Sequence, residues 1–395
     1  MKDVVVIGAA RTPFGNFGGM LKDFSTVQLG AIAVREAVRR AGIKPSDVEE
    51  VYIGANMPCS NRSIARQVAL EAGIPEDKNA ATIDRACCSS MAAIAMGYRA
   101  IKLGEIDVAV GGGTENMSQV PYFIEDLRWG KRLGDITLKD ILVVKCPYTG
   151  VPRAVQAGVK AVEYGITRED QDKWALRSQT RYWEAFRAGK FKDEIVPVEV
   201  PQRKGNPIIM DKDEPPREGV TLEALAKLPT VYGSPTVTAG NAPGLNTGAA
   251  AIVMTSSEKA EALGVTPLGT IVAHAQASGH PDGIATIPAF AALKVLEKAK
   301  MSIDDIDIIE INEAFAAMPL VSTKILGEGD DKKVEAIRAK TNVNGGAIAI
   351  GHPTGATGAR LVMTTLFELR RRGGGYGLVT ICGGIGEGEA FVLKV

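Results

Sequence analysis

The sequence lacks the charge excess and the long apolar runs that mark two large classes of protein. Lys plus Arg and Asp plus Glu each number 46 among 395 residues, so the formal net charge is zero. Nucleic-acid-binding proteins usually carry a basic excess, and we therefore expect no nucleic-acid partner. No run reaches the roughly 18 apolar residues of a membrane-spanning helix, so no membrane span is expected either.

Cysteine and histidine are also scarce. The five cysteines are Cys59, Cys87, Cys88, Cys146 and Cys382, and they form no Cys-x-x-Cys pair. An odd number in a chain of this size argues against a disulfide framework and favours the reducing cytoplasm. The apolar run at 4–7 is too short for a signal peptide. The cysteines and the three histidines are too scattered to predict a metal site.

What the sequence does contain is an alternation of short β-branched runs with longer amphipathic segments. The runs 4–7, 50–54 and 107–110 are typical of strands, whereas 26–41 and 91–103 have apolar residues at helical spacing. This alternation predicts an α/β protein with largely buried sheets.

The chain also resembles itself. Residues 26–54 and 286–312 both run from a helix through a Ser-Asp or Ser-Ile-Asp turn into a strand, and the strands 107–110 and 378–381 both lead into glycines. Any α/β protein shows some similarity of this kind between its segments, but the shared order of several elements favours a duplication. We therefore expect two similar halves.

The stretch 118–240 differs from both halves, because it is rich in prolines and charges around one helical segment, 168–188. We interpret it as an inserted loop domain that covers a ligand. The predicted division is an N-terminal half of 1–117 plus 241–268, the insertion 118–240, and a C-terminal half of 269–395.

Four segments could carry chemistry. Cys87 lies where a strand-like segment meets an apolar helix, and a helix N-terminus favours the thiolate by lowering the thiol pKa. His352 lies in a glycine-dense turn that a ligand can approach closely. Cys382 opens a glycine turn whose N–H groups could bind an anion. Asn312 follows a strand. Taken singly, these could equally be a structural cysteine, a structural histidine, a flexible turn and a helix N-cap.

Taken together and in this order, the four segments resemble the thiolase family. They are Cys87 with its loop, Asn312-Glu-Ala-Phe, Gly351-His352-Pro and Cys382-Gly-Gly. The segments 10–15, 113–118 and 238–242 also look like family motifs, so the resemblance covers essentially the whole chain. It implies the thiolase fold, an α/β fold of two duplicated halves layered αβαβα with an inserted loop domain, and a homodimer or tetramer.

The resemblance also implies a mechanism. Cys87 would be acylated in a ping-pong reaction, with His352 helping to deprotonate it and Cys382 acting as acid and base. One oxyanion hole would consist of His352 and a water held by Asn312, and the other of the backbone N–H groups of Cys87 and Gly384. Coenzyme A would be a substrate, with no permanently bound cofactor.

Further positions are matched to the binding of CoA and of the acyl group. They are Arg217 near the adenine, Ala314 and Phe315 near the pantetheine, Ala239 and Pro243 in the loop beside the thioester, and Ile284 in the acyl pocket. Several depart from the family pattern. Pro243 replaces a serine and Ile284 a methionine, and Asp84, Cys88, Ser90 and Thr247 are also unusual.

The largest departure is in the inserted domain, where Arg153-Ala-Val-Gln-Ala-Gly158 stands in place of the common Met-Gly-x-Thr-Ala-Glu. Arg153 would bring a cation near the acyl group, suited to a carboxylate. Alternatively, Arg153 faces solvent or pairs with an acid. We expect a bulky, aromatic or carboxylated substrate, such as 2-benzoylsuccinyl-CoA. A small partner subunit with a zinc ribbon and an OB fold is a further expectation, because some divergent thiolases need one.

Three other functions remain as alternatives. A generic acetyl-CoA C-acetyltransferase would share all of this machinery. A ketoacyl synthase would use a Cys-His-His set, whereas this chain has Asn312 and a second cysteine, Cys382. A noncatalytic scaffold that binds CoA esters would not need Cys87, His352 and Cys382 intact.

Overall fold

The computed structural model describes residues 2–57, 61–142 and 145–395, and Cys59 lies outside these ranges. The N-terminal part of the chain supplies most of one half of the molecule. Its elements are β1 (Val4–Arg11), β2 (Gly15–Asn16), α1 (Thr26–Arg40), β3 (Glu50–Gly54), α2 (Ile64–Glu71), β4 (Asn79–Ile83), α3 (Ser89–Leu103) and β5 (Val108–Asn116). Later in the chain, β10 (Asn246–Ser256) returns to this half and pairs between β1 and β5, and α7 (Ser257–Leu263) follows it.

The C-terminal part repeats this order of elements. It contains β11 (Gly269–Ser278), α8 (Ile287–Ala299), β12 (Ile308–Ile311), α9 (Ala317–Leu326), α10 (Asp331–Ala339), α11 (Ala347–Ile350), α12 (Thr357–Arg371), β13 (Tyr376–Cys382) and β14 (Glu387–Lys394). Short 3-10 turns lie at Pro45–Asp47, Met117–Gln119 and Ile303–Asp305.

The order and direction of the strands in the sheet show the duplication. Its strand order is β12-β13-β14-β11-β1-β10-β5-β3-β4, and the short pairing of β1 with β11 joins the two halves. In each half two antiparallel pairings are followed by a parallel one, so β11, β14, β13 and β12 correspond to β1, β10, β5 and β3. A single parallel bridge between Ile309 and Thr341 stands where β4 pairs with β3. The expected duplication is therefore confirmed.

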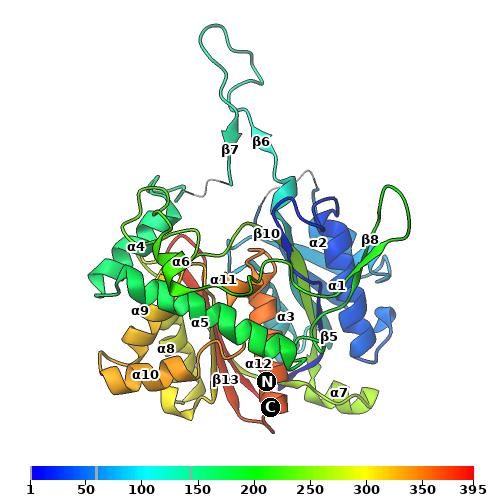
Figure 1. Cartoon of the computed structure of the whole chain (residues 1–395). Coiled ribbons are helices and arrows are strands. Elements are labelled where there is room, and N and C mark those ends of the chain that lie inside the picture. The colour runs from blue at the N-terminus through cyan, green and yellow to red at the C-terminus, as the bar shows by residue number, and fades with distance from the viewer. Residues whose placement is uncertain (1, 58–60, 143–144) are drawn as a thin grey trace.

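Helices cover the sheet in layers (Figure 1). The central helices α3 and α12 pack against each other and against strands of both halves in one apolar core. Helices α1 and α2 cover the outer face of the first half, and α8 and α9 cover that of the second. This is the αβαβα arrangement that the resemblance to the thiolase family implies. Both helices are buried over most of their length. Helix α3 is apolar nearly all round, whereas α12 is amphipathic and ends in the arginines Arg370 and Arg371.

Capping residues explain where the amphipathic helices begin. Ser25 accepts a hydrogen bond from the backbone of Gln28, and the Gln28 side chain accepts one from Ser25 in return, which starts α1. Thr167 and Asp170 form the same arrangement before α5 (Arg168–Arg187). Both helices begin at the positions expected from the sequence, within a residue or two.

Between β5 and β10, the chain leaves the sheet of the N-terminal half and forms a long excursion. It contains β6 (Tyr122–Phe123), β7 (Lys139–Asp140), α4 (Arg153–Glu163), α5 (Arg168–Arg187), β8 (Val198–Val200), β9 (Ile208–Met210) and α6 (Leu222–Ala226). The hairpin of β6 and β7 projects far from the body (Figure 1). Its large apolar side chains are exposed, Trp129 by 92% and Leu133 by 85%. None of the helices that the structure describes is long and apolar enough to cross a membrane.

Candidate active site

The duplicated fold places two loops at equivalent positions, one before each central helix. Cys87 lies in the loop that leads into α3, and His352 in the loop that leads into α12. Cys87 Sγ lies 3.3 Å from His352 Nε2. Ala86 has a φ of 48° and Gly351 a φ of 104°. Both loops therefore turn sharply, which brings the side chains of Cys87 and His352 together.

The orientation of the His352 ring is set by its neighbours. Thr357 Oγ1 lies 2.7 Å from His352 Nδ1 and donates its own hydrogen to the carbonyl of Pro353 at 3.0 Å. We therefore assign the hydrogen of the imidazole to Nδ1, which leaves Nε2 as an acceptor toward Cys87. The backbone N–H of His352 donates to Asn246 Oδ1 at 2.8 Å, which fixes the loop.

Both members of the pair are uncharged at rest. Burial raises the pKa of Cys87, and the nearby Cys382 raises it further, against an opposing effect of Arg153. Burial lowers the pKa of His352 to about 3, and Arg360 adds to this. The prediction that the helix N-terminus favours the Cys87 thiolate is therefore wrong for the resting state. Helix α3 begins only at Ser89, and loss of solvent outweighs its dipole.

Asn312 and Cys382 lie beside this pair. Asn312 Nδ2 is 3.4 Å from His352 Nε2, while its Oδ1 is buried with no partner among the described residues. Helix α9 begins at Ala317, so the alternative that Asn312 is a helix N-cap is wrong. Cys382 ends β13 and is buried, which raises its pKa, while the N–H of Gly384 opposes that rise.

One cavity of about 1200 Å³ brings most of the predicted site residues together. Among its lining residues are Cys87, Arg153, Pro243, Ile284, Ala314, Phe315, His352, Cys382 and Gly384. Arg217 and Ala239 do not line it and are exposed. Their predicted contacts with CoA stay predictions.

Further residues line the cavity that the sequence did not assign to the site, although Met117 lies in the motif 113–118. Met117 and Met318 add apolar surface, and the stem of the projecting hairpin closes one side with Leu138, Lys139 and Ile141. The hairpin residues could not be placed from the sequence, because no periodic pattern in 118–145 indicates which side faces inward.

A buried carboxylate next to the site was also not recognised as a structural support. Glu115 accepts hydrogen bonds from the backbone of Asn56, Met57 and Gly355 and from the hydroxyl of Thr354, at 2.7–3.2 Å. Burial raises its pKa to about 7, against the effect of these bonds. Glu115 thereby ties the loop after β3 to the loop that carries His352. Its presence in the motif 113–118 was the available signal.

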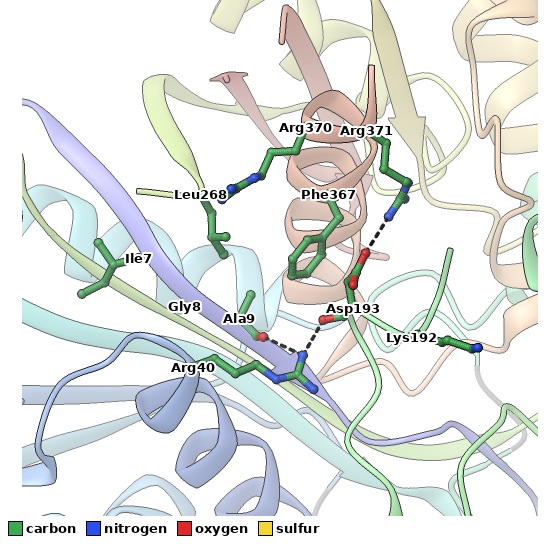
Figure 2. Close-up of a pocket in the computed structure, with 10 residues that line it drawn as sticks. All are labelled: Ile7, Gly8, Ala9, Arg40, Lys192, Asp193, Leu268, Phe367, Arg370 and Arg371. Carbon is green, nitrogen blue, oxygen red and sulfur yellow. Dashed lines mark hydrogen bonds and ion pairs between the residues drawn. The ribbon is translucent and has the colours of Figure 1, made fainter. Parts of the chain in front are cut away.

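A second cavity, of about 560 Å³, lies away from these residues (Figure 2). Several Arg and Lys side chains line it, and two of these arginines are bonded to other parts of the protein. Arg40 donates to the carbonyls of Ala9 and Asp193, and Arg371 lies 3.4 Å from the Asp193 carboxylate. No cysteine or histidine lines this cavity. It is therefore not a candidate for the nucleophilic site. No cluster of potential metal ligands occurs among the residues described.

Comparisons with known proteins agree over the whole chain. Family models of the thiolase N-terminal and C-terminal domains match residues 4–258 and 265–395. An acetyl-CoA acetyltransferase of Syntrophomonas wolfei is 44% identical, covering 100% of this chain and 99% of its own. The beta-ketothiolase BktB of Cupriavidus necator is 41% identical, with the same coverage.

Solved structures give the same result. The Bacillus anthracis acetyl-CoA acetyltransferase matches with a TM-score of 0.94 and 39% identity, over 100% of this chain and 99% of that one. Human mitochondrial 3-ketoacyl-CoA thiolase in complex with CoA matches with a TM-score of 0.92 and 40% identity, over 100% and 98%. These matches define the protein as an acyltransferase. It belongs to the thiolase family.

Proposed function

We propose that this thiolase cleaves a 3-oxoacyl-CoA with CoA, or runs the reverse condensation, through an acyl-enzyme on Cys87. The 3.3 Å contact between Cys87 Sγ and His352 Nε2 carries the proposal. A thiol with a raised pKa needs a base, and a neutral imidazole in contact with it is a suitable one.

The proposed steps follow from the residues in the cavity. His352 takes the proton of Cys87 as sulfur attacks the 3-oxo carbon, and the bond between C2 and C3 breaks. Cys382 then protonates C2 of the released acyl-CoA. It later takes the proton of the incoming CoA thiol as that sulfur attacks the acyl-enzyme; the bond from the acyl carbon to Cys87 Sγ breaks, and His352 returns its proton to Cys87. The backbone N–H groups of Cys87 and Gly384 would stabilise the tetrahedral oxyanion. His352 and a water on Asn312 would stabilise the enolate.

Coenzyme A is the proposed second substrate, and no resident cofactor is part of the reaction. Ala314, Phe315 and Pro243 line the cavity and are the proposed contacts of its pantetheine arm. Arg217 and Ala239, both exposed, would contact parts of CoA that lie outside the cavity.

For the acyl group we propose a bulky, aromatic or carboxylated substrate, with 2-benzoylsuccinyl-CoA as the specific candidate. The size of the cavity and the cation of Arg153 in its lining support this. The generic acetyl-CoA C-acetyltransferase is the second candidate, favoured by the names of the relatives.

Incubation of the chain with a panel of CoA esters distinguishes these two. The acyl group left on Cys87 is identified by peptide mass spectrometry, with Cys87→Ala as the control for labelling elsewhere. We expect an aroyl or other bulky acyl group. Preference for acetoacetyl-CoA over every bulky or acidic ester would overturn the substrate proposal and leave the thiolase chemistry standing.

We also propose a cytoplasmic homodimer or tetramer, and a small partner subunit with a zinc ribbon and an OB fold. The exposed apolar side chains of the β6–β7 hairpin support self-association. Weak activity of the isolated chain, restored by a co-expressed small subunit, would support the second partner. Full activity of the isolated chain would argue against it.

A further inference from the structure

The active-site cavity contains a guanidinium that no acid neutralises. Arg153 lines it, and within residues 2–57, 61–142 and 145–395 no ion pair of 4.0 Å or less joins Arg153 to an Asp or Glu. A Cβ built on Gly384 would lie 3.5 Å from Arg153 Nη2. The guanidinium therefore faces the turn that carries Cys382, in the same cavity as Cys87. The alternative that Arg153 pairs with an acid of its own chain does not hold.

Local helix stability does not explain a cation at this position. Arg153 is the first residue of α4, and Pro152 before it provides no side-chain cap. The N-terminus of a helix carries partial positive charge, so a cation there is unfavourable. Acidic residues are absent from this first turn as well. The arrangement adds positive potential to the cavity, where an anionic ligand would be attracted.

A partly buried hydrogen-bond chain holds the guanidinium in place. Arg153 Nη1 donates to Gln156 Oε1 at 3.0 Å, and Gln156 Nε2 donates to Asp282 Oδ1. Gln156 is only 3% exposed, and Thr149 Oγ1 donates to the same Asp282 oxygen at 3.4 Å. Asp282 lies two residues before Ile284, which lines the cavity. The chain thus connects α4 with the loop of the C-terminal half that borders the cavity.

We propose that Arg153 binds a carboxylate on the acyl part of the substrate, and that Gln156 and Asp282 are positioning residues for it. This rests on the proposed thiolase function and adds a charge requirement to it. A guanidinium binds a carboxylate through two parallel hydrogen bonds, so its orientation matters as much as its charge. An uncharged acyl group would leave the guanidinium without a partner, which selects against such substrates.

A matched pair of thioesters tests the charge requirement. 3-Oxoadipyl-CoA and 3-oxohexanoyl-CoA have the same chain length and differ by a carboxylate in place of a methyl group. The readout is the ratio of their kcat/KM values in thiolysis, because any general effect of Arg153 on Cys87 cancels in a ratio. We expect Arg153→Met to lower this ratio about tenfold to a hundredfold. The matched control is Arg35→Met, an exposed arginine on α1 far from the cavity, which should not change it.

The positioning role has its own test. Gln156→Met and Asp282→Leu remove the hydrogen-bond chain, and should raise KM for the carboxylated ester more than they lower kcat. Asp282→Asn keeps an acceptor for Gln156 and should hold the ratio within about twofold of the wild type or raise it. Equal behaviour of Asp282→Asn and Asp282→Leu would overturn the positioning role.

Two failures can be told apart. If the wild type acylates Cys87 but prefers the uncharged ester, and Arg153→Met leaves the ratio unchanged, the carboxylate inference fails while the thiolase function stands. If no ester acylates Cys87 in single-turnover mass spectrometry, the proposed function itself fails. A wild-type preference for the carboxylated ester that Arg153→Met removes supports both.

Discussion

Cys87 and His352 face each other in uncharged form, which makes their reactivity depend on pH in a specific way. The imidazole stays neutral above its lowered pKa of about 3, so it does not titrate near neutral pH. The thiol has a raised pKa, so its thiolate fraction is small and increases as pH rises.

We therefore predict that alkylation of Cys87 by iodoacetamide accelerates about tenfold per pH unit between about pH 6 and pH 9, with no plateau. The rate is measured on the Cys87 peptide by mass spectrometry. Cys87→Ala shows how much label the neighbouring Cys88 takes up. A plateau near neutral pH would indicate a preformed thiolate and contradict the neutral pair.

Glu115 provides a second prediction at this scale. Its Oε1 accepts from Met57 N–H and its Oε2 from Gly355 N–H, so an amide in its place would set an NH₂ group against a donor. We expect Glu115→Gln to lower the free energy of unfolding by about 1–3 kcal/mol. Urea denaturation measures the loss, with the exposed Glu71→Gln as control. An unchanged midpoint would mean that the loops hold without this carboxylate.

The sequence predicts individual residues of the site better than their electrostatics. Motif order brought Cys87, His352 and Cys382 into one proposed site, and the structure places all three on one cavity. The direction of the Cys87 pKa shift was not predictable, because burial depends on what the rest of the chain places around the thiol. The support that Glu115 gives is equally a property of two loops far apart in sequence.

At the scale of elements, short periodic segments were predictable, but the end of a strand that continues through glycines was not. The expected helix 26–41 is α1, Thr26–Arg40, and the expected strand 50–54 is β3 without change. The strand predicted at 107–110 continues as β5 to Asn116 through Gly111–Gly113. A Cβ on Gly113 would lie 1.8 Å from the carbonyl oxygen of Gly355, so these glycines allow close packing inside a strand.

One buried side chain, that of Arg11, joins β1 to the excursion 118–240 through two ion pairs. Arg11 is fully buried at the end of β1 and pairs with Glu194 at 3.0 Å and Asp213 at 2.7 Å. We predict that Arg11→Met destabilises the protein by about 3–5 kcal/mol, because two carboxylates would stay buried without a cation. Thermal and urea unfolding measure this.

The control is Arg187→Met, since Arg187 pairs with Glu218 at the surface, where such pairs contribute little. Equal stability of both variants and the wild type would show that the excursion is held by other contacts. The domain boundaries predicted from the sequence, at 117/118, 240/241 and 268/269, stay predictions.

At the scale of the whole molecule, the β6–β7 hairpin exposes large apolar side chains that no contact within one chain buries among the residues described. Trp129 and Leu133 are exposed by 92% and 85%, and burial of such surface contributes roughly 25 cal/mol per Å². We predict that Trp129→Ser combined with Leu133→Ser lowers the mass of the oligomer measured by light scattering. Circular dichroism should stay unchanged. A wild type that is already monomeric, or a variant of unchanged mass, would contradict self-association through this hairpin.

The equivalent positions of Cys87 and His352 have a consequence for how such a site can arise. Two identical halves, paired as separate chains, would present two cysteines or two histidines to each other across their symmetry axis. A nucleophile facing its base needs unlike residues at these two positions. Joining the halves in one gene lets each copy mutate on its own, so covalent fusion is what allows a symmetric scaffold to hold asymmetric chemistry.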